Sequence, residues 1–223
     1  MSLDIIIDLN LEQLRVQFIR YTRKAFHMLP KMDQPCILDI GCGSGIPTLE
    51  LAQLSNGEII GIDIDQDALD KLKIKIEKME LTDRVKFINT SLYNSNLPSS
   101  SFDILWDEGV IHILDLKKSL RECNRLLKLN GYLVAGEMIK WIENKFKTFS
   151  KFGFKLINQF LLPKNCWWTE YYAPLEKKVI ELRLRYSHAE DLEKLKPYER
   201  EIEMVKKNPQ EFDCGFYIMQ KIK

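Results

Sequence analysis

The stretch Ile37-Leu38-Asp39-Ile40-Gly41-Cys42-Gly43-Ser44-Gly45 decides the fold of this 223-residue chain. An apolar run leads into three glycines at alternate positions, and residues 46–52 then have the pattern of a helix with Pro47 in its first turn. This order is typical of a buried strand that turns tightly into a helix. Glycine permits positive φ in such a turn and leaves room for a ligand beside the backbone.

A second strand supports this interpretation. Residues 58–65 predict a strand with Asp63 at its carboxyl end, 22 residues after Gly41. That spacing suits a βαβ unit whose second strand presents a carboxylate to two ribose hydroxyls. The third glycine comes one residue too early for the dinucleotide pattern G-x-G-x-x-G, and Asp39 is an additional acid. The spacing therefore disfavours a pyrophosphate site and a nicotinamide dehydrogenase.

These two motifs together resemble the class I S-adenosylmethionine-dependent methyltransferases. The likeness continues through residues 102–109 and 126–133, and residues 162–174 resemble a small-molecule subgroup, methyltransferase type 11 or ubiquinone-biosynthesis-like. The resemblance implies an α/β fold, a doubly wound Rossmann-like seven-stranded sheet whose last strand is antiparallel. It also implies S-adenosyl-L-methionine as cofactor and S-adenosyl-L-homocysteine as product.

The resemblance also implies a set of cofactor-binding residues. An acid often accepts from the adenine amino group in the family, and Ser91 stands there instead, beside Leu92. Cys42 is interpreted as a small filler in the glycine turn, with a nucleophile as the alternative. The expected cofactor-binding residues are Asp39, Gly41, Cys42, Gly43, Gly45, Asp63, Ile64, Ser91, Leu92, Trp106 and Asp107.

Candidate catalytic residues follow the fourth predicted strand, residues 104–106. Open α/β sheets bind ligands at the carboxyl ends of their strands, where Asp107 and Glu108 stand. Side chains alternate along an extended chain, so one acid can hold the cofactor's ammonium group while the other faces the methyl acceptor. Glu108 is predicted to bind the acceptor or remove its proton, and His112 is the rival base. A cap on the following helix is the alternative role of Glu108, and Tyr171 completes the catalytic candidates.

The remaining sequence is expected to complete a single methyltransferase domain over residues 1–223. Residues 10–30 predict one amphipathic covering helix that ends before Pro30. Residues 163–213 predict a helical insert or lid before the last strand, and an insert of that length is expected to be functional or structural in its own right. The aromatic residues at 167–172 are interpreted either as packing of this insert or as one wall of a substrate pocket.

Composition limits the remaining possibilities. The net charge of +1 argues against nucleic acid as an obligate partner. The five cysteines have no metal-ligand spacing, so no metal is expected and a reducing cytoplasm is favoured. No apolar run reaches the length of a membrane span, so no membrane contact is expected. The expected function is methyl transfer to a small molecule; the alternatives are cofactor binding without catalysis, or methylation of RNA or protein. The oligomeric state is not predicted.

Overall fold

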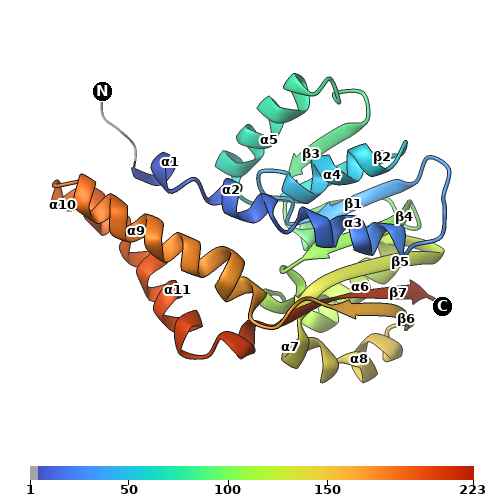
Figure 1. The fold of residues 1–223 in the computed structure, drawn as a ribbon. Helices are drawn as coiled ribbons and strands as arrows, with labels where there is room; N and C mark the ends of the chain where they lie inside the picture. The colour runs from blue at the N-terminus through green and yellow to red at the C-terminus, as the bar shows by residue number, and fades with distance from the viewer. Residues whose placement is uncertain (1–4) are drawn as a thin grey trace. The chain divides into compact units, whose positions relative to one another are not determined.

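The computed structural model describes residues 5–223, and the chain divides into two compact units (Figure 1). The sheet unit consists of Ile19–Leu161 and Cys214–Lys223. The helical unit consists of residues 5–18 and Leu162–Asp213. Each unit has its own hydrophobic core, so each is described by itself.

Across residues 5–223, seven strands form one sheet in the order β3-β2-β1-β4-β5-β7-β6. Strands β1 to β5 pair in parallel, whereas β7 pairs antiparallel with both β5 and β6. The predicted doubly wound sheet with an antiparallel last strand is therefore confirmed. The strands are β1 (Cys36–Ile40), β2 (Glu58–Asp63), β3 (Val85–Asn89), β4 (Phe102–Glu108), β5 (Leu127–Met138), β6 (Phe154–Leu161) and β7 (Cys214–Lys221).

Helices cover both faces of this sheet. The face that carries Leu38, Leu105 and Leu133 packs against α6 (Leu116–Leu126), α7 (Ile139–Glu143) and α8 (Phe146–Lys151). On the opposite face α3 (Ile19–His27) packs beside α4 (Ile46–Leu54) (Figure 1). The sheet unit also contains α5 (Gln66–Lys78) and two short 3-10 helices, η1 (Leu92–Asn94) and η2 (Ile111–Ile113).

The helical unit contains the whole of the predicted insert, residues 163–213. Its helices are α1 (Ile5–Leu9), α2 (Leu11–Val16), the π-helix η3 (Trp168–Tyr172), α9 (Ala173–Arg185), α10 (Ala189–Glu193), α11 (Lys196–Lys207) and the 3-10 helix η4 (Pro209–Phe212). Leu175, Val179 and Leu182 of α9 are buried, and their spacing of four and three residues places them on one face of the helix. Within residues 5–223, no helix is long and apolar enough to cross a lipid bilayer.

The single helix predicted over residues 10–30 is wrong in one respect: it is interrupted between α2 and α3. Phe18 stacks on Trp167 with ring centroids 4.4 Å apart, and the Arg15 guanidinium lies 4.9 Å from the Trp167 centroid. The next turn instead packs in the sheet unit, where the Thr22 hydroxyl bonds to Glu108. The two halves serve different cores, which the sequence periodicity does not reveal.

Candidate functional site

The glycine turn after β1 is held to the end of β2 by backbone hydrogen bonds. The Gly41 and Cys42 amides both donate to the Ile62 carbonyl, at 2.8 and 3.1 Å. Gly41, Gly43 and Gly45 all have positive φ, at 70, 51 and 85°. The turn thus uses the conformational freedom of glycine at each position, and it places Gly43 between the ends of the two strands.

The three glycines meet different surroundings. A methyl group on Gly41 would lie 2.3 Å from a Val110 methyl carbon, and one on Gly45 would lie 2.2 Å from a Leu72 methyl carbon. At Gly43, by contrast, no atom of the described chain lies within 4 Å of the added carbon, apart from its immediate neighbours in sequence. Gly41 and Gly45 are therefore required by packing, whereas Gly43 borders open space in which a ligand can lie against the backbone.

Alanine at Gly41 and Gly43 should separate these two roles. Both substitutions place a side chain at positive φ, but only Gly41→Ala also overpacks the contact with Val110, which costs ~1–3 kcal/mol. Gly41→Ala is therefore expected to lower the free energy of unfolding by about that much more than Gly43→Ala, as measured by denaturant titration. Equal losses in the two variants would contradict this assignment.

Asp63 joins the glycine turn to the end of β2. Its Oδ2 accepts from the Gly43 amide at 2.7 Å, and its Oδ1 accepts from the Asp65 amide at 2.9 Å. Two carboxylate oxygens offer about four lone-pair sites, so two sites remain for the hydroxyls of a ligand. The next residue, Ile64, is 75% exposed. The Asp65 side chain caps the N-terminus of α5, because it accepts from the Ala68 amide.

The side chains of Asp39 and Cys42 are both buried at this turn. Asp39 is 2% exposed, and its Oδ2 accepts from the Thr48 hydroxyl of α4 at 2.5 Å. Burial raises the pKa of Asp39 to about 7, against the opposing effect of the Thr48 bond. Burial also raises the pKa of the Cys42 thiol, which packs against Gly61. A protonated, buried thiol supports the filler interpretation over a nucleophile.

The end of β3 lies beside Asp63. The Thr90 amide donates to the Asp63 carbonyl at 2.9 Å, which places Ser91 and Leu92 next to the carboxyl end of β2. Ser91 precedes η1 without capping it through its side chain, and Leu92 is buried. The hydroxyl of Ser91 is thus not used as a helix cap.

The two acids at the end of β4 have different partners, as strand alternation predicts. Asp107 is fully buried, and its Oδ1 accepts from the Val110 and Ile111 amides at 3.1 and 3.0 Å. Asp107 therefore supports the start of η2. The alternative in which Glu108 only caps the following helix is wrong, because Asp107 accepts the amides at η2 and the Asp115 side chain caps α6.

Glu108 lies on the other face of the sheet. Its Oε1 accepts from the Thr22 hydroxyl of α3 at 2.8 Å and from the Trp106 indole N–H at 2.9 Å. Trp106 is fully buried, and its ring packs against Phe26 and Phe216. Its indole N–H is therefore fixed in place and orients the Glu108 carboxylate. Two donors from different elements hold one oxygen of this partly exposed carboxylate.

His112 contacts a residue to which the sequence assigned no role. Its backbone amide donates to Glu137 Oε1 at 3.2 Å, and its Nδ1 lies 3.3 Å from the same oxygen. Glu137 is in β5 and is 1% exposed. The hydrogen bond with Glu137 raises the pKa of His112, whereas burial lowers it by less. The signal in the sequence was an acid near the end of a predicted strand, the same signal that pointed to Asp63.

Tyr171 belongs to the helical unit. Its ring packs edge-on against Trp167 and Tyr172, with centroids 5.6 and 4.9 Å away. Burial raises its pKa. These aromatic residues thus pack against one another and against Phe18, and a catalytic role for Tyr171 stays a prediction.

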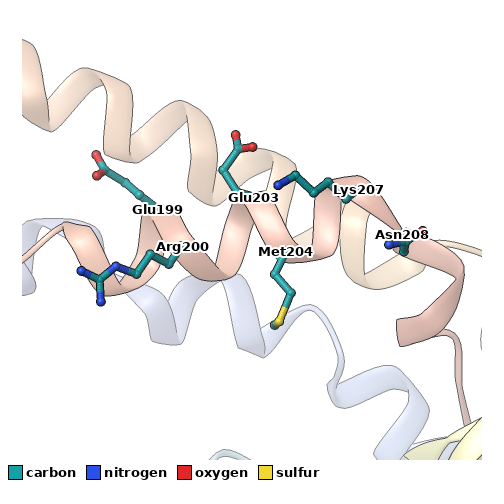
Figure 2. Close-up of a pocket in the computed structure, with 6 residues that line it drawn as sticks. All are labelled: Glu199, Arg200, Glu203, Met204, Lys207 and Asn208. Carbon is teal, nitrogen blue, oxygen red and sulfur yellow. The ribbon is translucent and has the colours of Figure 1, made fainter.

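The helical unit also has an open depression along α11, shown in Figure 2. Its lining includes two acidic and two basic side chains. None of the predicted site residues lines it. The lining residues are Glu199, Arg200, Glu203, Met204, Lys207 and Asn208.

Comparison with known proteins decides the family of the region that contains the glycine turn and the end of β4. Residues 38–135 match the family described as Methyltransferase domain. These residues belong to the methyltransferase domain family. The match begins inside β1 and ends inside β5, so it includes the ends of β1, β2, β3 and β4.

One relative that matches this region is named as a methyltransferase. A 27-O-demethylrifamycin SV methyltransferase of Amycolatopsis mediterranei is 30% identical over 121 residues, which cover 54% of this chain. The match covers 44% of that relative, so the chain spans less than half of its length.

Solved structures share the fold at low sequence identity. The cyclase SpnF has a TM-score of 0.76 at 18% identity, covering 91% of this chain and 80% of that one. A methyltransferase from Thiobacillus denitrificans, in complex with S-adenosyl-L-homocysteine, has a TM-score of 0.69 at 18% identity, with 90% of each chain covered. At these identities the likeness concerns the fold alone.

The residues of the methyltransferase domain fit S-adenosylmethionine, the cofactor of this family. Gly43 provides an uncovered backbone position, and Asp63 retains lone pairs for two ribose hydroxyls. Ser91 and Leu92 stand at the adjacent strand end. These features lie together at one edge of the sheet, where open α/β folds bind their ligands.

Proposed function

We propose that this protein transfers the methyl group of S-adenosylmethionine to a small-molecule acceptor. The observation that supports this most directly is the open face of Gly43 beside the Asp63 carboxylate, within a methyltransferase domain. When bound, S-adenosylmethionine supplies a methyl group activated on a sulfonium. The protein's remaining tasks are alignment of the acceptor and exclusion of water.

In this proposal, each strand end has its own task. Asp63 accepts from the ribose hydroxyls, and Ser91 with Leu92 borders the adenine. The backbone of the turn at Gly43 lies along the rest of the cofactor. Glu108 binds the acceptor, because its carboxylate is held by donors from two elements and is partly exposed. The small number of cysteines supports the reducing cytoplasm that is expected for the protein.

A second function is favoured by one observation. The fold is shared with SpnF, which is a cyclase, so this architecture also serves chemistry other than methyl transfer. In that case the protein binds the cofactor without releasing the demethylated product.

Calorimetry of the purified protein tests the first step of the proposal. S-adenosylmethionine and S-adenosylhomocysteine should both bind, and NAD should bind far more weakly because the glycine spacing does not suit a pyrophosphate. NAD binding as tightly as S-adenosylmethionine contradicts the cofactor assignment. A panel of small alcohols, phenols, thiols, amines and acids then tests catalysis, with release of S-adenosylhomocysteine as the readout. Cofactor binding without any release favours the second function.

A further inference from the structure

Two buried acids hold the backbone that leads from β4 into η2. Asp107 of β4 accepts through Oδ1 from the Val110 and Ile111 amides, at 3.1 and 3.0 Å. Glu137 of β5 accepts through Oε1 from the next amide, that of His112, at 3.2 Å. Three successive amides therefore end on two carboxylates, so the path of this loop depends on both acids.

The loop that the two acids hold packs against the glycine turn. A methyl group on Gly41 would lie 2.3 Å from a Val110 methyl carbon, so the Val110 side chain lies directly on the backbone of the turn. Two residues further on, the Gly43 amide donates to the Asp63 carboxylate. A shift of residues 110–112 would therefore be transmitted to the residues that hold the cofactor in the proposed function.

The second oxygen of each acid has no hydrogen-bond partner among the residues that the structure describes. These atoms are Asp107 Oδ2 and Glu137 Oε2, in residues that are 0% and 1% exposed. The β4–β5 register pairs Asp107 with Ala135, so Glu137 is on the same face of the sheet, and the two acids lie within hydrogen-bonding reach. One proton between Oδ2 and Oε2 gives both oxygens a partner.

The surroundings of the two acids favour this proton. Burial raises the pKa of Asp107 well above its ordinary value, and the charge of Glu137 raises it further, against the opposing effect of the two amide bonds. The other titratable groups nearby are His112 of η2, Cys123 of α6, Glu143 of α7 and Tyr217 of β7. Of these four groups only His112 can become positive, and one imidazolium balances only one of the two carboxylates.

We propose that Asp107 and Glu137 share one proton and act together as positioning residues that hold residues 110–112 against the glycine turn. Asp107 then supports cofactor binding through the turn, rather than by the direct contact expected from the sequence. Without the proton, two adjacent buried charges repel each other, and the repulsion is relieved when one carboxylate releases its amides and turns toward water. The proposal rests on the cofactor position in the proposed function, but the shared proton is measurable in the free protein.

Cofactor affinity should accordingly fall as pH rises. A group whose pKa is raised in the folded state stabilises that state most at low pH, and this contribution is lost as pH rises through the raised pKa. Here the stabilised state is the loop bonded to both acids, and its opening releases the shared proton to water. The loop should therefore open more readily at alkaline pH.

Amide substitutions test the shared proton through stability. In Asp107→Asn, the amide oxygen still accepts from the loop amides, and the NH₂ group donates to Glu137 in place of the proton. Glu137→Gln gives the reverse arrangement. The double variant places two NH₂ groups against each other, so its loss of unfolding free energy should exceed the sum of the two single losses. A loss equal to that sum would overturn the proposal.

Infrared spectroscopy of the free protein needs only one variant. Just above the pKa of Asp39, which is about 7, the band of a protonated carboxylic acid should persist in wild type and disappear in Asp107→Asn. Absence of this band from wild type would overturn the proposal, even if the double variant does not fold.

Calorimetry then connects the proton with the cofactor site. The affinity of wild type for S-adenosylmethionine, divided by that of Asp107→Asn at the same pH, should fall by up to about tenfold per pH unit, because the amide cannot ionise. The ratio removes any titration of the ligand itself. Glu122→Gln, which changes an acid of α6 paired with Arg125, should follow wild type at every pH. A ratio that does not change with pH would overturn the positioning role. No binding by any form, with the infrared band present, would instead contradict the proposed function.

Discussion

Glu108→Gln should lower methyl transfer by ~10²-fold or more while cofactor affinity and stability hold. The substitution keeps an amide oxygen that can still accept from the Thr22 hydroxyl and the Trp106 indole, so the local packing is retained. It removes the negative charge offered to the acceptor, and a small misplacement of a reacting group costs about 10²-fold. Turnover is measured as release of S-adenosylhomocysteine at saturating cofactor, with affinity from calorimetry.

Two further variants separate binding of the acceptor from support of the fold. Thr22→Val removes one of the donors that orient Glu108 and should reduce turnover less than Glu108→Gln does. Lys128→Met removes an exposed partner of Asp103 far along the strand and should leave turnover unchanged. Unchanged turnover in Glu108→Gln, or a loss confined to cofactor binding, would show that Glu108 does not bind the acceptor.

The strands and the glycine turn could be predicted from sequence because their signals are local. An apolar run that ends in glycines marks the end of β1, and an acid before a helical repeat marks the cap at Asp65. The opposite directions of Asp107 and Glu108 follow from the geometry of any extended chain. Each of these features depends on neighbours within a few residues.

The parts that could not be predicted depend on pairing between distant segments. Glu137 meets His112 only because the register of β5 against β4 places the two strand ends side by side. Likewise, position 41 requires glycine because the Val110 side chain leaves no room for a methyl group. The break after α2 depends on the stacking of Phe18 on Trp167. A single sequence shows that an acid ends a strand, but not which residue it will face.

Asp63→Ala is expected to weaken S-adenosylmethionine binding by ~10²–10⁴-fold. A hydrogen bond to a charged group contributes ~1.5–3 kcal/mol, two ribose hydroxyls bond to this carboxylate in the proposal, and each 1.4 kcal/mol is about tenfold in affinity. The structure adds a second cost, because Asp63 also accepts from the Gly43 amide that borders the open face. Alanine therefore loosens the turn as well as removing the ribose contacts.

Two neighbouring substitutions distinguish these contributions. Asp63→Asn keeps one side-chain oxygen for the Gly43 amide but loses the charge, so its affinity should lie between those of wild type and Asp63→Ala. Asp65→Ala removes the N-cap of α5 and should cost ~1 kcal/mol of stability, yet it keeps the backbone amide that donates to Asp63 and should bind the cofactor normally. Calorimetry gives the affinities, and denaturant titration gives the stabilities. If Asp63→Ala binds as tightly as wild type, the carboxylate does not contact the ribose, and the cofactor lies elsewhere along the glycine turn.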